Sequence, residues 1–143
     1  MKNIFFLLII ISLLFSCTNN KDENKSSTEN TSPQKIEKLI PQDFAVEMTE
    51  LKSFNLIDVR TTQEYEQGNI SKAKNINFND ASFGEELNKL EKNKPLFIYC
   101  KSGGRSAKAV EKAKEMGFEH IIELDGGIES WNDANVETTH GIE

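Results

Sequence analysis

The pattern of apolar and polar positions divides the chain into three parts. Residues 4–15 are apolar apart from one serine, and residues 18–34 hold no aliphatic or aromatic side chain. From residue 36 onward, short apolar runs alternate with polar stretches. Only this third part can bury enough apolar surface to form a core. The pattern therefore predicts a single folded domain over residues 36–143, preceded by an apolar leader and a polar segment.

Within the predicted domain, strand-like runs alternate with helix-like spacing. Short apolar runs predict strands, and apolar residues three or four positions apart predict helices. The expected strands cover residues 36–40, 54–59, 73–76, 96–99 and 119–124. The expected helices are one over 41–51, a short one capped by Thr61 or Thr62 and broken at Gly68, one marked by Phe83, Leu87 and Leu90, one that follows the loop after Cys100 and stops at Gly117, and a last one that begins with Ile128 and Trp131. This alternation predicts an α/β fold, an open and mostly parallel five-stranded sheet with helices on both faces.

The start of the chain has the features of an export signal. Its apolar stretch, as a helix, would span roughly 18 Å, which is short of the ~30 Å hydrocarbon core of a bilayer. Residues 1–16 are therefore expected to be a signal peptide and not a membrane span. Leu14-Phe15-Ser16-Cys17 resembles the lipobox of bacterial lipoproteins, which implies cleavage before Cys17 and its acylation. An ordinary secretory signal with an incidental cysteine is the alternative.

Composition and charge also bear on the location of the protein and on the partners it can have. An acylated Cys17 would anchor the protein to a membrane of the cell envelope after export. Residues 17–35 are expected to be a disordered tether, because so polar a segment cannot offset the entropy of ordering. The net charge is -6 with both signs interleaved, so nucleic acid is not an expected partner. With Cys17 modified, Cys100 would be a free thiol, and no cofactor or metal is expected.

The candidate chemistry lies in one turn. Cys100 directly follows the predicted strand 96–99. A small cationic loop comes next and leads into a helix. Open α/β sheets bind ligands at such strand-to-helix turns. The loop N–H groups and the helix N-terminus would stabilise a Cys100 thiolate, and the Arg105 side chain is expected to add positive charge facing an anion. An ordinary core cysteine is the alternative, but it would need neither the glycines nor the arginine.

Four motifs, in order along the chain, are similar to those of single-domain rhodaneses. They are Leu56-Ile57-Asp58-Val59-Arg60 with Glu64-Tyr65 and Gly68-Asn69-Ile70; Ala73-Lys74-Asn75-Ile76; Cys100-Lys101-Ser102-Gly103-Gly104-Arg105-Ser106; and Gly126-Gly127-Ile128-Glu129-Ser130-Trp131. The segment 36–137 thus resembles a rhodanese. It departs from the family at Asn69, where histidine is usual, and in a tail that lacks the usual proline.

The resemblance implies a sulfurtransferase that carries a sulfane sulfur as a persulfide on Cys100. It implies a small anionic sulfur donor such as thiosulfate, bound by the loop residues Lys101, Ser102, Gly103, Gly104, Arg105 and Ser106. Lys101 could steer anions or merely be solvated, and Ser106 could face the persulfide or cap the helix. Asp58 and Arg60 are expected to support the site, preferably as a structural ion pair. An external thiol or cyanide must accept the sulfur, because the domain has no second cysteine.

Other functions remain open at this stage. A persulfide carrier for a protein partner is one, and a binding module without turnover is another, although such modules usually lose the cysteine. Phosphatases and arsenate reductases of the same fold have one more residue between cysteine and arginine than the four found here. A cysteine–histidine hydrolase is disfavoured. His120 is expected at the sheet edge opposite the Cys100 loop, and His140 lies in the tail.

Overall fold

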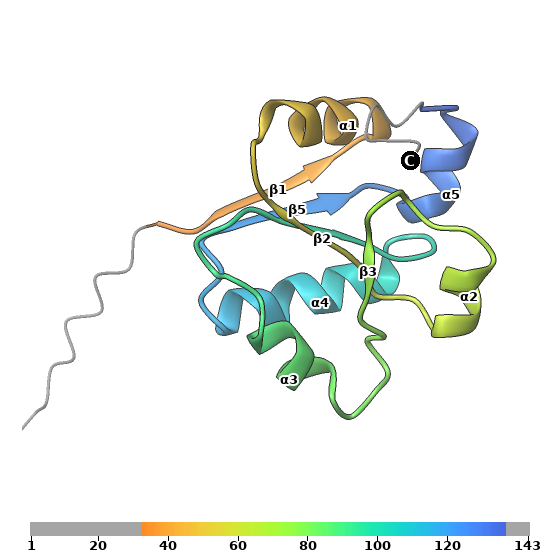
Figure 1. The fold of residues 1–143 in the computed structure, drawn as a ribbon. Helices are drawn as coiled ribbons and strands as arrows, with labels where there is room; N and C mark the ends of the chain where they lie inside the picture. The colour runs from red at the N-terminus through yellow and green to blue at the C-terminus, as the bar shows by residue number, and fades with distance from the viewer. Residues whose placement is uncertain (1–32, 137–143) are drawn as a thin grey trace, which may run out of the picture. The chain divides into compact units, whose positions relative to one another are not determined.

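The computed structural model describes residues 33–136, which all belong to one compact unit, and its strands and helices follow the expected order (Figure 1). The strands are β1 (Lys35–Leu39), β2 (Asn55–Asp58), β3 (Lys74–Asn75), β4 (Leu96–Tyr99) and β5 (His120–Leu124). The helices are α1 (Pro41–Glu50), α2 (Thr62–Glu66), α3 (Phe83–Asn88), α4 (Gly104–Glu115) and α5 (Gly127–Asp133). The expected signal peptide 1–16, Cys17, nearly all of the expected tether and His140 lie outside the described residues.

The sheet is parallel throughout, where the sequence predicted a mostly parallel one. Its strand order is β1-β5-β4-β2-β3, and every neighbouring pair runs in the same direction. β4 lies in the middle, and all four of its residues are buried. Because parallel strands end at the same edge of a sheet, the segments that follow β2, β4 and β5 meet there. Cys100 directly follows β4 and lies at that edge.

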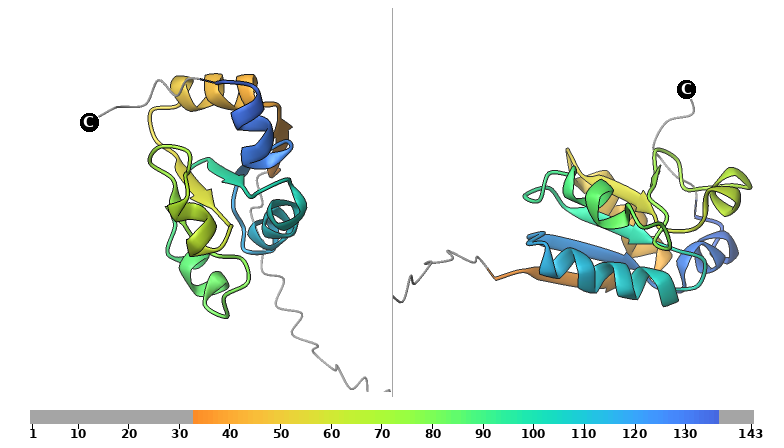
Figure 2. Two further views of the ribbon diagram at one scale, coloured as in Figure 1. Left: turned by 90° about the vertical axis from the view of Figure 1, so that its right-hand side faces the viewer. Right: turned by 90° about the horizontal axis from the view of Figure 1, so that it is seen from below.

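Helices cover both faces of the sheet because the central strands are apolar on both sides. α1 and α5 lie on one face, and α3 and α4 lie on the other (Figures 1 and 2). Phe97 of β4 packs in the cluster of α1 and α5, whereas its neighbour Ile98 packs in the cluster of α3 and α4. α2 stands near the edge where the strands end (Figure 1), so it can contribute side chains to the Cys100 region.

Several element boundaries differ from the prediction, and β1 and β3 show the reason. β1 begins at Lys35, inside the segment expected to be tether, because Lys35 pairs in register with His120 of β5. The Gln34 side-chain amide also donates to the carbonyl oxygens of Lys114 at 3.0 Å and Phe118 at 2.9 Å. β3 is reduced to two residues, since only Lys74 and Asn75 pair with β2. Backbone pairing therefore sets the ends of β1 and β3, and apolar periodicity does not predict them.

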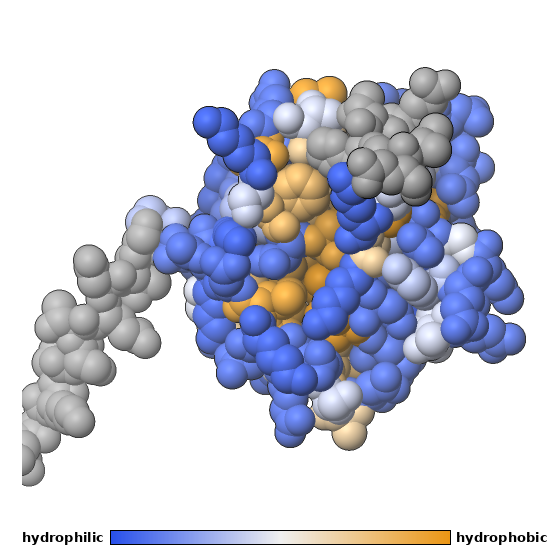
Figure 3. All heavy atoms as spheres, viewed as in Figure 1, coloured by the Kyte–Doolittle hydropathy of each residue, from blue (hydrophilic) through white to orange (hydrophobic). Residues whose placement is uncertain are grey.

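The surface of this unit is largely polar. Figure 3 shows a mostly hydrophilic face with apolar atoms along a band across its middle. The large apolar side chains that are exposed lie on or next to β1 and α1, namely Ile36, Ile40 and Val46. Across residues 33–136, no helix has both the length and the apolar character needed to cross a membrane.

Candidate active site

The loop after β4 folds back onto the sulfur of Cys100. Cys100 is almost completely buried, and the N–H of Gly103 donates to its Sγ at 3.1 Å. Gly103 is the N-cap of α4 and has φ +106°, which glycine adopts without strain. The predicted cradle of backbone N–H groups is therefore present, with Gly104 at the first position of α4 behind it.

The environment of Cys100 favours its ionised form. Burial raises the pKa of the thiol, but the hydrogen bond between Sγ and the Ser106 hydroxyl, together with the N–H groups of Ser106, Gly103 and Ser102, outweighs burial. Together they hold the pKa of Cys100 below its ordinary value. The N-terminus of α4 lies at the same place and also favours negative charge. A thiolate nucleophile is therefore supported without any nearby histidine.

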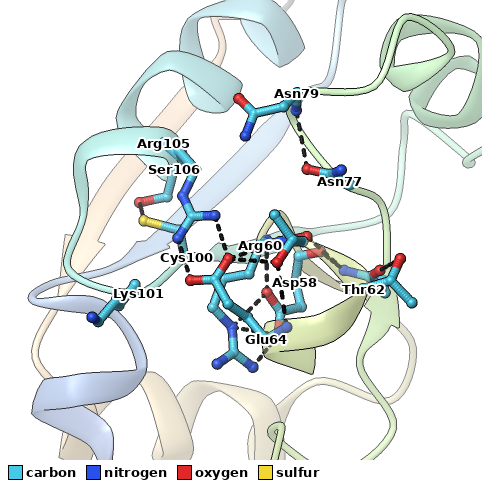
Figure 4. Close-up of polar contacts among 12 residues, drawn as sticks. Asp58, Arg60, Thr62, Glu64, Asn77, Asn79, Cys100, Lys101, Arg105 and Ser106 are labelled. Atoms are coloured by element: carbon cyan, nitrogen blue, oxygen red, sulfur yellow. Dashed lines mark hydrogen bonds and ion pairs between the residues drawn. The ribbon is translucent and has the colours of Figure 1, made fainter. Parts of the chain in front are cut away.

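The positive charge of Arg105 is already paired. Its guanidinium lies beside Cys100 and forms two hydrogen bonds to Glu64 of α2, of 2.6 and 2.7 Å (Figure 4). Arg105 and the N-cap Thr61 together hold the pKa of the Glu64 carboxyl at about 2. From the sequence, Arg105 was expected to face an anion, and its pairing with Glu64 was not predicted. Thr61 and Glu64 have capping-box spacing, which predicts the start of α2 but not a partner 41 residues away.

The remaining loop side chains divide between solvent and core. Lys101 is exposed, with its Nζ 3.5 Å from a carboxylate oxygen of Glu129 in α5, and Ser102 is also exposed. Ser106 is fully buried, and its Oγ lies 3.4 Å from Cys100 Sγ. Of the two roles considered for Ser106, helix capping is wrong, because Gly103 is the N-cap. Its hydroxyl instead lies directly against the sulfur.

Asp58 and Arg60 form a buried clamp at the end of β2. The Arg60 Nη2 donates to Asp58 Oδ2 at 2.6 Å, and its Nε lies 2.9 to 3.0 Å from both carboxylate oxygens. Nη2 also donates to the carbonyl of Gly68 at 2.6 Å. In the described part of the chain, neither the Asp58 nor the Arg60 side chain forms a hydrogen bond with Cys100. The pair therefore supports the site indirectly, by tying β2 to the turn that follows α2.

The start of α5 holds the other side of the loop. The N–H of Ile128 donates to the carbonyl of Cys100 at 2.9 Å, and that of Glu129 donates to the carbonyl of Lys101 at 3.1 Å. Gly127 has φ +63°, and a Cβ there would lie 2.5 Å from the Lys101 oxygen and 2.6 Å from the Cys100 oxygen. Close backbone contact with the Cys100 loop thus requires glycine at Gly127, the second residue of the Gly126-Gly127 motif.

Histidine is absent from this edge in the described part of the chain. His120 begins β5, and its Nε2 lies 2.7 Å from Glu37 Oε2. Parallel strands begin at the edge opposite to Cys100, so the sequence placed His120 correctly, whereas His140 lies outside the described residues. Residues 33–136 also contain no group of three or more histidine, cysteine or acidic side chains that could hold a metal.

Comparisons with known proteins agree with this geometry. A family model described as Rhodanese-like domain matches residues 24–134. Thiosulfate sulfurtransferase GlpE of Shewanella oneidensis is 32% identical over 90 residues, 63% of this chain and 87% of that protein. Putative sulfur carrier protein YrkF of Bacillus subtilis is 30% identical over 112 residues, 78% of this chain and 55% of that protein. A rhodanese-like domain protein from Staphylococcus aureus aligns with TM-score 0.61 at 30% identity, covering 72% of this chain and 98% of its own.

Proposed function

Because the chain belongs to the rhodanese-like domain family, we propose that it is a sulfurtransferase that carries a sulfane sulfur as a persulfide on Cys100. The observation that carries this proposal is the cradle around the sulfur. The Gly103 N–H contacts Sγ directly, and the N–H groups of Ser102 and Ser106 also lower the pKa of the thiol. A nucleophilic thiolate needs such an environment.

The proposed reaction has two steps. The Cys100 thiolate attacks the outer sulfur of a donor such as thiosulfate, the S–S bond of the donor breaks, and sulfite leaves with the bonding electron pair. An acceptor thiolate or cyanide then attacks the outer sulfur of the persulfide, and Cys100 leaves as a thiolate. The loop N–H groups stabilise the anionic sulfur in both steps. The distant homologue GlpE, named as a thiosulfate sulfurtransferase, supports thiosulfate as the donor.

The acceptor must come from outside the domain. Cys17 and Cys100 are the two cysteines of the chain, so an acylated Cys17 leaves Cys100 no partner for an internal disulfide. A persulfide carrier that passes sulfur between proteins is the second candidate, and the similarity to YrkF, named a putative sulfur carrier, favours it. Phosphoryl transfer has less support, because the Arg105 guanidinium that would bind a phosphoryl group is bonded to Glu64.

Intact-mass spectrometry tests the persulfide directly. The full chain carrying Cys17→Ser keeps Cys100 as its sole cysteine, and incubation with thiosulfate should add the mass of one sulfur atom. The added mass should disappear when cyanide or a small thiol is supplied. Cys100→Ser in the same background should gain nothing. No gain with thiosulfate, mercaptopyruvate or glutathione persulfide would contradict a sulfurtransferase, and a gain from a persulfide donor alone would favour the carrier.

A further inference from the structure

A buried carboxylate lies next to the active-site loop, and the sulfur-transfer steps above do not use it. Glu123 belongs to β5 and is only 7% exposed. It follows Ile122, which packs toward α1 and α5, so its side chain lies on the opposite face, beneath α4. Its Oε1 is 2.6 Å from Ser106 Oγ, and that Oγ is 3.4 Å from Cys100 Sγ. Sulfur, hydroxyl and carboxylate thus form a continuous buried chain.

The hydroxyl of Ser106 has one hydrogen but three acceptors within reach. They are the Glu123 carboxylate at 2.6 Å, the Gly103 carbonyl at 3.0 Å and Cys100 Sγ at 3.4 Å. The shortest contact has the length of a hydrogen bond from a hydroxyl to an ionised carboxylate. With Glu123 ionised, the hydrogen therefore points at Glu123 and away from the sulfur. Ser106 Oγ can then only accept a hydrogen bond from Cys100, which requires the thiol form.

We propose that Glu123 is a positioning residue that controls the proton of Cys100 through Ser106. When the thiolate forms, the S–H bond breaks, its electron pair stays on Sγ and its proton passes to a base in solution. The thiolate and the Glu123 carboxylate then compete for the single hydrogen of Ser106. While that hydrogen stays on the carboxylate, the thiolate lacks the hydroxyl and lies near a second negative charge, so Glu123 opposes ionisation of Cys100. The same competition acts on the thiolate that an acceptor releases, so the role of Glu123 in turnover rests on the proposed sulfur transfer.

The other charges around this chain are largely compensated. The charged side chains that flank it from the neighbouring elements are Lys38 with Asp125, Arg105 with Glu64, Lys101 with Glu129 and Arg60 with Asp58. Lys38 is the register neighbour of Glu123 on β1, but it is half exposed and lies 3.2 Å from Asp125. Glu123 itself is hydrogen-bonded by a neutral hydroxyl. The competition for the Ser106 hydrogen is therefore chiefly between Glu123 and Cys100.

The pH dependence of Cys100 alkylation tests the proposal. In the full chain with Cys17→Ser, the rate of reaction with iodoacetamide follows the thiolate fraction of Cys100. Glu123→Gln keeps the side-chain shape but removes the negative charge that attracts the Ser106 hydrogen. We expect its midpoint to fall by about one pH unit or more, because the thiolate gains the hydroxyl and loses a like charge. Glu119→Gln, which removes an exposed carboxylate just before β5, should keep the parent midpoint.

A second variant separates competition for the Ser106 hydrogen from simple charge repulsion. Glu123→Asp keeps the charge but withdraws the carboxylate from Ser106, so the competition predicts a fall in midpoint close to that of Glu123→Gln. A parent-like midpoint for Glu123→Asp would show that charge repulsion alone acts, and would overturn the role of Ser106. An unchanged or raised midpoint for Glu123→Gln would overturn the proposal whether or not Glu123→Asp folds. Alkylation needs no sulfur transfer, so these outcomes are independent of the persulfide test.

Discussion

At the scale of single residues, the ion pair between Arg105 and Glu64 links the active site to the stability of the fold. The guanidinium binds both carboxylate oxygens and holds the pKa of Glu64 at about 2, well below the ordinary value of a glutamate. A group with a depressed pKa in the folded state contributes stability above its unfolded pKa and loses that contribution as the pH falls toward the folded pKa. The contribution should therefore be complete at neutral pH and decline from about pH 5 toward pH 2.

Urea unfolding of Glu64→Gln between pH 7 and pH 3 checks this expectation. At pH 7 the variant should lose roughly 1–2 kcal/mol of unfolding free energy, because a charge-assisted double hydrogen bond is replaced by a weaker one. The difference from the parent should shrink as the pH falls. Glu66→Gln, which changes an exposed carboxylate of the same helix, should follow the parent. If the parent and Glu64→Gln lose the same unfolding free energy between pH 7 and pH 3, the ion pair is not the source of the pH dependence.

At the scale of elements, α5 supports the loop that follows Cys100. Its first N–H groups bind the carbonyls of Cys100 and Lys101, and Gly127 lets the two backbones approach. In Gly127→Ala, the methyl group would lie about 2.5 Å from backbone oxygens, and φ would stay at +63°. We expect a loss of roughly 2–4 kcal/mol in unfolding free energy. Persulfide formation in the fraction that remains folded should also fall, since the loop must move.

A second glycine provides the matched control. Gly84 lies inside α3, and a Cβ built there meets no atom within 4 Å. Gly84→Ala should therefore be neutral or stabilise the domain by up to about 1 kcal/mol, because alanine favours the helix. Thermal unfolding of the two variants under identical conditions makes the comparison. Equal melting temperatures for Gly127→Ala and the parent would refute the close-contact explanation of Gly127.

At the scale of the whole molecule, we propose that Cys17 is a lipid attachment site that holds the domain at a membrane of the cell envelope. The proposal rests on the lipobox-like Leu14-Phe15-Ser16-Cys17, which lies outside the described residues. Residues 18–34 separate Cys17 from β1, and a chain of that length reaches roughly 55 Å when fully extended. The active-site edge could therefore meet sulfur donors and acceptors away from the bilayer surface.

Metabolic labelling with a fatty acid in a bacterial host tests the attachment. The full chain should incorporate the label and sediment with membranes, and Cys17→Ser should lose the label. Cys100→Ser should behave as the parent does, because its thiol is buried in the domain. If Cys17→Ser sediments with membranes as an unprocessed chain, the leader itself is the anchor and the lipid proposal fails. Soluble, processed and unlabelled parent protein would indicate an ordinary secretory signal instead.

Local patterns were sufficient to predict the order of the elements and the position of Cys100 in the turn between a buried strand and a helix. Apolar periodicity marked the five strands and five helices of residues 33–136, and their alternation indicated parallel pairing. The run that ends at Cys100 and the glycines after it identified the thiolate cradle. These features depend on residues close together in the chain, and backbone geometry links such patterns directly to local structure.

Tertiary structure alone decided which charges surround the sulfur. Glu64 reaches Arg105 across 41 residues, and Glu123 reaches Ser106 across 17. Gly127 meets the carbonyls of Cys100 and Lys101 only because α5 returns to the loop. Apolar periodicity says which face a residue occupies but not which strands are neighbours or in what register they pair. The tertiary arrangement, with its strand order β1-β5-β4-β2-β3, therefore brought Arg105 of the loop to Glu64 and Ser106 to Glu123.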